Sequence, residues 1–145
     1  MENTQTIYLY TDGASSGNPG PGGYGAVLVC GNLRKEISGG FAVTTNNRME
    51  LLAVIKGLEC IRWTGATVEV YSDSQYVVNT LTKGWKRKKN NDLWDRYDQL
   101  GARFNVRFHW IKGHAGHPEN ERCDRLAVEA YGRPSLPQDP GYTAE

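Results

Sequence analysis

The stretch IYLYTDGASSGNPGPGGYGAVLVC, residues 7–30, predicts how the fold begins. Its first six residues alternate in side-chain direction and character as in a strand. Residues 13–23 are rich in glycine and proline, which indicates a turn region. Residues 24–30 predict a second strand, and a hairpin turn at residues 31–32 is expected to lead into a third strand at residues 34–43.

Beyond these strands, helical and extended patterns alternate along the chain. The expected elements are a helix capped by Asn46 or Asn47 and running to about residue 63, a strand at 67–72, a short helix at 74–82, a helix at 92–103, a strand at 105–111 and a helix at 118–131. The order β-β-β-α-β-α-α-β-α predicts an α/β fold with a five-stranded mixed sheet flanked by helices. We expect one domain over residues 1–132 and an irregular tail over residues 133–145, which holds three prolines and no periodic pattern.

Length and composition restrict the class of protein. A chain of 145 residues suits one domain with its own core, and 39% hydrophobic with 23% charged residues fits a soluble globular protein. No apolar run approaches the roughly 20 residues of a membrane helix, and the N-terminus lacks a signal pattern. We therefore expect a cytoplasmic protein without membrane contact. The odd number and wide spacing of Cys30, Cys60 and Cys123 argue against a disulfide framework and favour small buried side chains.

The net charge of +1 does not indicate a nucleic-acid-binding protein, but the distribution of charge is uneven. Basic residues crowd around Trp85, namely Lys83, Lys86, Arg87, Lys88 and Lys89. This pattern suits a solvated loop, and it equally suits contact with a phosphate backbone beside a stacked sugar or base. Both interpretations stay open on the residues alone.

Four carboxylates are predicted to meet at one edge of the sheet. Asp12 and Asp73 each end a predicted strand, and ligands of open α/β sheets gather outside such ends. Glu50 and Asp124 border the apolar stripes of two predicted helices, so they are expected to lean toward the sheet. Each acid alone could be a turn residue, a cap or a surface charge. Four converging acids repel one another unless divalent cations lie among them, and oxygen ligands favour Mg²⁺ or Mn²⁺ over zinc.

Several motifs, in this order and spacing, resemble those of the bacterial type I ribonuclease H family over nearly the whole chain. They are TDGASSGNPGPGGYGA (residues 11–26), TTNNRMEL (44–51), SDSQYV (72–77) and KGHAGHPENERCD (112–124), with Leu-Ala at residues 126–127. The resemblance implies a ribonuclease H-like fold. It also implies an endonuclease that cleaves the RNA strand of an RNA–DNA hybrid without sequence specificity.

The resemblance assigns roles to individual residues. Asp12, Glu50, Asp73 and Asp124 match the family's metal-binding carboxylates, and His114 matches a histidine that assists proton transfer and product release. Positions that touch the hybrid are matched by Asn18, Thr45, Asn46, Asn47 and Gln75, while Trp94 and the region of Trp85 resemble parts of the DNA-strand channel and phosphate pocket.

One stretch departs from the family pattern. Well-known members carry an additional helix and a basic loop where this chain has only VNTLTKGWKRKKNNDLW, residues 78–94. Lys86, Arg87, Lys88 and Lys89 are expected to replace part of the missing charge and to bind substrate.

The expected mechanism uses two divalent ions, Mg²⁺ with Mn²⁺ as a substitute, roughly 3.5–4 Å apart on either side of the scissile phosphate. Asp12 is expected to bridge the two ions. As in the family, the products would carry 5′-phosphate and 3′-hydroxyl ends. We expect a monomer without a small-molecule cofactor.

Other functions fit the sequence less well. Residues 20–25 formally match G-x-G-x-x-G, but they open a predicted strand and not a helix, which argues against dinucleotide binding. The spacing of His109, His114, His117 and Cys123 fits no zinc motif; His117 is better explained as a structural or helix-start residue. A transposase or resolvase of the same superfold would share the acidic cluster, but the NPGPGG and TNNRMEL motifs favour ribonuclease H. A non-enzymatic hybrid-binding module would have lost a carboxylate.

Overall fold

A computed structural model describes residues 5–112 and 116–143 of the chain and contains one five-stranded sheet. The elements are β1 (Ile7–Ser15), β2 (Gly20–Cys30), β3 (Leu33–Thr44), α1 (Asn46–Glu59), β4 (Thr67–Ser72), α2 (Gln75–Lys83), α3 (Asn91–Gly101), β5 (Asn105–Trp110) and α4 (Pro118–Tyr131). The strand order is β3-β2-β1-β4-β5. β1, β2 and β3 pair antiparallel, whereas β4 pairs parallel with both β1 and β5. The predicted element order and mixed sheet are therefore confirmed.

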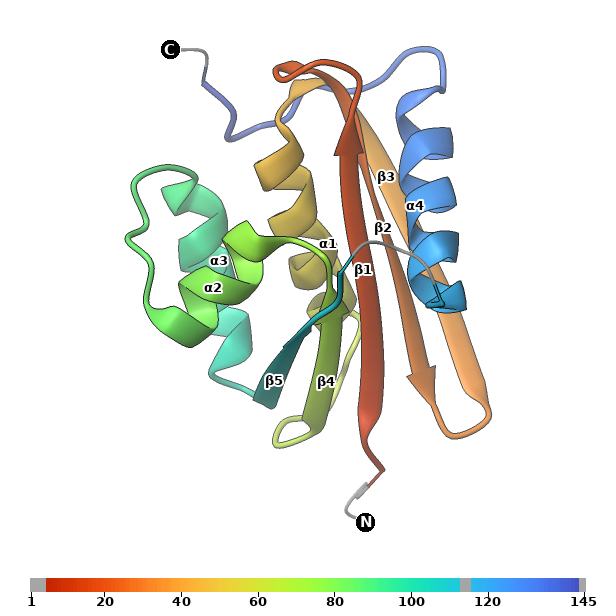
Figure 1. Ribbon diagram of the computed structural model, residues 1–145, viewed down its shortest axis with the longest axis vertical. Coiled ribbons are helices and arrows are strands. Elements are labelled where there is room, and N and C mark those ends of the chain that lie inside the picture. Colours follow the sequence, from red (N-terminus) through yellow and green to blue (C-terminus); the bar gives the residue numbers. More distant parts are fainter. Residues whose placement is uncertain (1–4, 113–115, 144–145) are drawn as a thin grey trace.

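The helices lie on both faces of the sheet (Figure 1). α1 packs against β1 and β2, with α2 and α3 beside it, and α4 packs against β1, β2 and β3 on the other face. The main core lies under α1. The apolar stripe predicted for this helix is buried, with Leu51, Val54, Ile55 and Leu58 on α1 and Ile61 just after its end. Val27, Cys123 and Leu126 form a smaller cluster under α4. None of the described helices is both long and apolar enough to span a membrane.

The glycine-rich segment after Asp12 belongs largely to the sheet, so the prediction of a turn over residues 13–23 was wrong except at residues 16–19. β1 continues to Ser15 and β2 begins at Gly20. A side chain at Gly23 or Gly25 would collide with backbone carbonyls of α4. Glycine is present here because the helix lies directly on the strand, since glycine allows close backbone approach as well as turns.

The start and end of α1 also differ from the prediction. Thr45, and neither Asn46 nor Asn47, is the N-cap: its backbone is extended and its hydroxyl accepts a 3.2 Å hydrogen bond from the Arg48 N–H. The helix ends at Glu59 and not near residue 63, because the next two N–H groups bond to carbonyls three residues back and tighten the last turn. The other helices and strands lie within a few residues of their predicted bounds.

The three cysteines are free thiols. Cys123 is buried, as expected, whereas Cys30 and Cys60 are only partly buried. The hairpin turn predicted at residues 31–32 is confirmed, since Cys30 pairs with Leu33 and Gly31 has a φ of 59°.

The described part of the C-terminal tail, residues 133–143, has no helix or strand but is anchored to the domain. Asp139 is buried and accepts hydrogen bonds from Nε and Nη2 of Arg48 at 2.7 and 3.1 Å. Its carboxylate also accepts a 2.6 Å hydrogen bond from the Thr44 hydroxyl. Arg48, 2% exposed, reaches Asp92 at the start of α3 as well. The tail, α1 and α3 therefore share one buried guanidinium.

We predict that Asp139→Ala destabilises the protein by about 3 kcal/mol, because removing one partner of a buried ion pair leaves the other charge poorly compensated. Urea unfolding followed by circular dichroism measures this free energy. The exposed neighbour provides a control, since Gln138→Ala should change stability by no more than about 0.5 kcal/mol. Equal effects of the two substitutions would contradict a role for the Arg48–Asp139 pair.

Candidate active site

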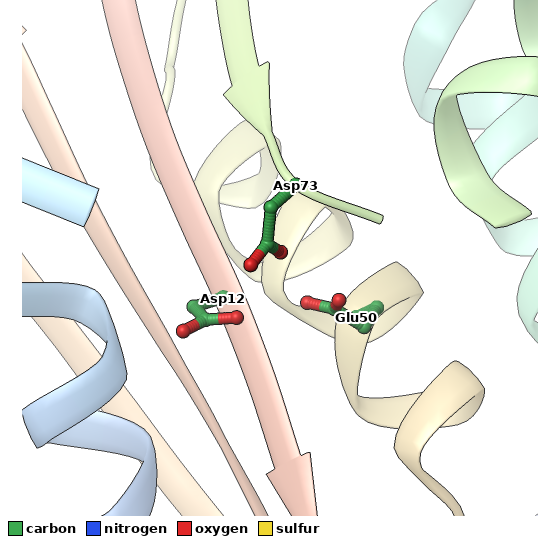
Figure 2. A group of neighbouring side chains, drawn as sticks. All are labelled: Asp12, Glu50 and Asp73. Carbon is green, nitrogen blue, oxygen red and sulfur yellow. The ribbon is translucent and has the colours of Figure 1, made fainter. Parts of the chain in front are cut away.

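Three carboxylates converge at the end of the β1–β4 pairing. Asp12, Glu50 and Asp73 each offer one oxygen, and these three oxygens lie within 4.8 Å of one another. Figure 2 shows the three side chains pointing toward a common space: Asp12 from β1, Asp73 from the segment just after β4, and Glu50 from α1. β1 continues past Asp12, but its pairing with β4 ends at Tyr10 and Tyr71. Asp12 and Asp73 therefore lie just beyond the last paired residues, which is why both can face the same space.

Gly13 brings Glu50 to this position. A Cβ atom at residue 13 would collide with the backbone of Met49 and Glu50, so α1 lies directly on β1 here. The Gly13 N–H donates to Glu50 Oε1 at 2.6 Å and lies 3.0 Å from Asp12 Oδ1. One backbone group thus orients two of the three carboxylates.

Burial and mutual repulsion shape the electrostatics of the cluster. Asp12 and Glu50 are 3% and 5% exposed, and Asp73 is partly buried. Burial, and then the charges of Asp12 and Asp73, raise the pKa of Glu50 well above its usual value. A set of buried carboxylate oxygens matches the ligand preference of hard divalent cations. These residues therefore fit a hard divalent cation, whose charge would offset their repulsion.

Asp124 lies on α4 and is not part of the group of three oxygens. It is partly buried and lies one helical turn after Asn120, so both residues occupy the same side of the helix. Asn120 contacts backbone carbonyls of β1 and β4. The Cys123 carbonyl lies over Gly25, the β2 residue paired with Asp12. Asp124 is therefore on the sheet-facing side of α4, at the level of Asp12.

Of the two histidines in the GHAGH segment, residues 113–117, His117 lies within the described part of the chain. His114 lies outside the described residues. His117 occupies the N-cap position of α4, and its carbonyl accepts the N–H of Glu121, so it starts the helix as expected.

The polar residues expected to touch the hybrid lie at the starts of α1 and α2. Asn18 Oδ1 accepts a 3.0 Å hydrogen bond from the Asn46 N–H, which joins the turn after β1 to the helix that carries Glu50. Thr45 caps this helix, and Asn47 is exposed in its first turn. Gln75 is the exposed first residue of α2, two residues after Asp73.

The basic segment forms the connection between α2 and α3. Trp85 is 48% exposed, and Lys86 to Lys89 are exposed as well. Arg87 pairs with Asp98 at 2.6 Å, and its guanidinium lies 4.7 Å from the ring centroid of Trp94. Trp94 itself is only 1% exposed and donates its indole N–H to the Tyr76 hydroxyl. The buried Trp94 therefore contacts the basic segment through Arg87, whereas Trp85 is about half exposed to solvent.

Sequence reasoning missed three residues that build this site: Gly13, Arg48 and Asn120. Gly13 could have been noticed as the glycine directly after a candidate ligand. Arg48 and Asn120 lie inside the quoted motifs, but their partners are distant in sequence and no local pattern indicates them.

Comparison with known proteins identifies the family. A family model described as RNase H matches residues 4–131. A curated protein named ribonuclease H from Desulforamulus reducens is 54% identical over 94% of both chains. The structure also resembles LC9-RNase H1, described as a type 1 RNase H with the type 2 active-site motif, with a TM-score of 0.80, 31% identity and coverage of 100% of this chain and 80% of that one.

A further solved structure has a bound nucleic acid. LC11-RNase H1, from compost, was solved in complex with an RNA/DNA hybrid. It matches with a TM-score of 0.74 and 28% identity, over 87% of this chain and 96% of that one. Because a family model spans most of the chain and a curated relative shares more than half of its residues, this chain belongs to the ribonuclease H family of enzymes.

Proposed function

We propose that this enzyme hydrolyses the RNA strand of RNA–DNA hybrids at the cluster of Asp12, Glu50 and Asp73. The convergence of their three oxygens within 4.8 Å carries the proposal. The hybrid bound to LC11-RNase H1, a protein of similar fold, supports the choice of substrate.

In this proposal Asp12, Glu50, Asp73 and Asp124 would hold two Mg²⁺ ions, which Mn²⁺ could replace, with Asp12 as the central ligand. When bound, the ions would supply the charge that activates a water and offsets charge on the scissile phosphate. The chain's own contribution is to hold these ligands rigidly, through the Gly13 contact and the buried start of α1. His114 is assigned to proton transfer and product release. The products are 5′-phosphate and 3′-hydroxyl ends.

Recognition in this proposal rests on sugar and phosphate contacts and not on base edges. The 2′-hydroxyl of RNA donates and accepts hydrogen bonds, and asparagine and glutamine side chains can do both. Asn18, Thr45, Asn46 and Asn47 lie at the start of α1, which carries Glu50, and Gln75 begins α2 two residues after Asp73. Trp85 and the basic residues after it form an exposed surface suited to the phosphates of the hybrid. Trp94 contributes indirectly, by supporting Arg87.

We predict that Asp12→Asn abolishes hybrid cleavage and leaves the fold intact, because the central carboxylate ligand loses its charge while the side chain keeps its shape. A gel assay with Mg²⁺ on RNA–DNA hybrid, duplex RNA and duplex DNA measures cleavage and specificity together. Asp95→Asn, on the exposed side of α3, is the control and should cut the hybrid normally. Substantial cutting by Asp12→Asn, or equal cutting of all three duplexes, would contradict the proposal.

A second prediction concerns how Glu50 affects the stability of the protein without bound metal. A carboxyl whose pKa is raised in the folded state binds a proton more tightly there than in the unfolded chain. The folded state therefore loses stability as the pH rises from the ordinary pKa of Glu50 through its raised value. We expect Glu50→Gln to be more stable than the unsubstituted protein in EDTA at pH 8, with a smaller difference at pH 5. Urea unfolding at both pH values measures this.

The same measurement with excess Mg²⁺ serves as the control. The advantage of Glu50→Gln should shrink or reverse there, because the unsubstituted protein gains stability from the bound ion and the variant gains less. The electrostatic explanation would be refuted if the difference in unfolding free energy between Glu50→Gln and the unsubstituted protein changed with neither pH nor Mg²⁺.

A third prediction concerns the basic segment. Replacing Lys86, Arg87, Lys88 and Lys89 with alanine should weaken hybrid binding and flatten its dependence on salt concentration. Each lost phosphate contact lowers the slope of log affinity against log salt by roughly 0.7–0.9. Fluorescence anisotropy with catalytically inactive Asp12→Asn protein, at several salt concentrations, gives the slope. Lys35→Ala, on β3, should leave it unchanged. An unchanged slope in the fourfold variant would show that the segment is only a solvated surface.

A further inference from the structure

Asn120 lies where α4 meets the ends of β1 and β4. It is the third residue of the helix and only 2% exposed. Its side-chain N–H groups donate to the carbonyl of Tyr71 at 3.1 Å and to the carbonyl of Thr11 at 3.4 Å. Thr11 directly precedes Asp12, and Tyr71 lies two residues before Asp73. One amide therefore holds the backbone just upstream of two carboxylates of the cluster.

This amide lies at the point where the strands separate. The parallel pairing of β1 and β4 ends at Tyr10 and Tyr71, and the carboxylates face each other beyond that point. The Asn120 amide continues the link between the two strands after their own pairing has stopped. Its orientation is determined by its surroundings, because only the NH₂ group can face two carbonyl oxygens.

The side-chain oxygen of Asn120 does not stabilise the folded state. Asn120 Oδ1 is buried and makes no hydrogen bond with the residues that the structure describes. A buried polar atom left without a partner costs free energy, so the side chain stabilises the fold less than a fully bonded amide. The Asn120 side chain matters to the site chiefly by fixing where the neighbouring residues of α4 lie. Asp124 follows one turn later on the same side of α4, and Cys123 between them donates its thiol to the Tyr10 carbonyl at 3.2 Å.

We propose that Asn120 is a positioning residue for the metal site. Its amide sets the separation of the β1 and β4 ends and the position of α4 relative to them. It thereby sets the arrangement of Asp12, Asp73 and Asp124. This inference rests on the proposed function. Without the amide N–H groups, the strand ends and the helix start move relative to each other, and the carboxylates bind cations less tightly. The surfaces at the starts of α1 and α2 that face the hybrid are unaffected.

The test replaces Asn120 with leucine, which has a similar shape and no hydrogen-bonding groups, and with alanine as a second variant. Isothermal titration calorimetry with Mn²⁺ measures cation binding directly, without reference to activity. We expect metal affinity to fall roughly 10- to 100-fold, the range found when groups that orient metal ligands are removed. The KM for hybrid should stay unchanged, and kcat should recover at saturating Mn²⁺. Asn105→Ala, an exposed asparagine at the start of β5, is the matched control and should bind Mn²⁺ normally.

Several outcomes separate this inference from its alternatives. Unchanged Mn²⁺ affinity in folded Asn120→Leu or Asn120→Ala, with only a lowered melting temperature, would overturn the inference in favour of a purely structural role. A fall in apparent Mn²⁺ affinity no larger than the folded fraction of the variant accounts for, with that fraction measured by circular dichroism, would also overturn it. Asp12→Asn is measured in parallel. If this variant loses Mn²⁺ binding and the Asn120 variants do not, only the inference fails; if Asp12→Asn binds Mn²⁺ normally, the proposed metal site itself fails.

Discussion

The contact between Gly13 and the second turn of α1 is the constraint on which the site depends. The backbone of α1 lies so close to β1 that no side chain fits at residue 13. That approach buries Glu50 beside Asp12 and lets one backbone N–H reach both carboxylates. A buried cluster of acids opposes folding unless the surrounding packing or a bound ion compensates it. The apolar stripe of α1, fully packed on the sheet, supplies that compensation in the folded chain.

The same helix also organises the surface around the carboxylates. Thr45 caps it, Asn18 binds its first N–H, and Arg48 links it to α3 and to the tail. Asn90, another partner of Arg48, donates to the Tyr76 hydroxyl, which also accepts the indole N–H of Trp94. The polar groups at the start of α1 and the residues that support the basic segment are therefore linked to the helix that carries Glu50 by hydrogen bonds, most of them partly buried. Their relative positions respond to the same packing.

Most helices and strands could be predicted because local periodicity and packing agree in them. The glycine segment was misjudged because glycine signals a turn locally, whereas Gly23 and Gly25 serve a contact with α4 that only the tertiary structure creates. Convergence of Asp12, Glu50 and Asp73 followed from strand ends and helix stripes. The burial of Trp94 and the exposure of Trp85 could not be read from two tryptophans nine residues apart. The metal-binding roles of Asp12, Glu50, Asp73 and Asp124 and the role of His114 remain predictions.

The ion pair between Arg48 and Asp139 has a consequence for the order in which the chain acquires its structure. The two residues are 91 positions apart, and the guanidinium is buried at the start of the helix that carries Glu50. During synthesis, β1, α1 and β4 leave the ribosome long before residue 139 exists. Contacts this distant in sequence close late, because the intervening chain must first be ordered. The Arg48–Asp139 pair, which completes the surroundings of the start of α1, therefore forms only after every strand and helix from β1 to α4 has been made.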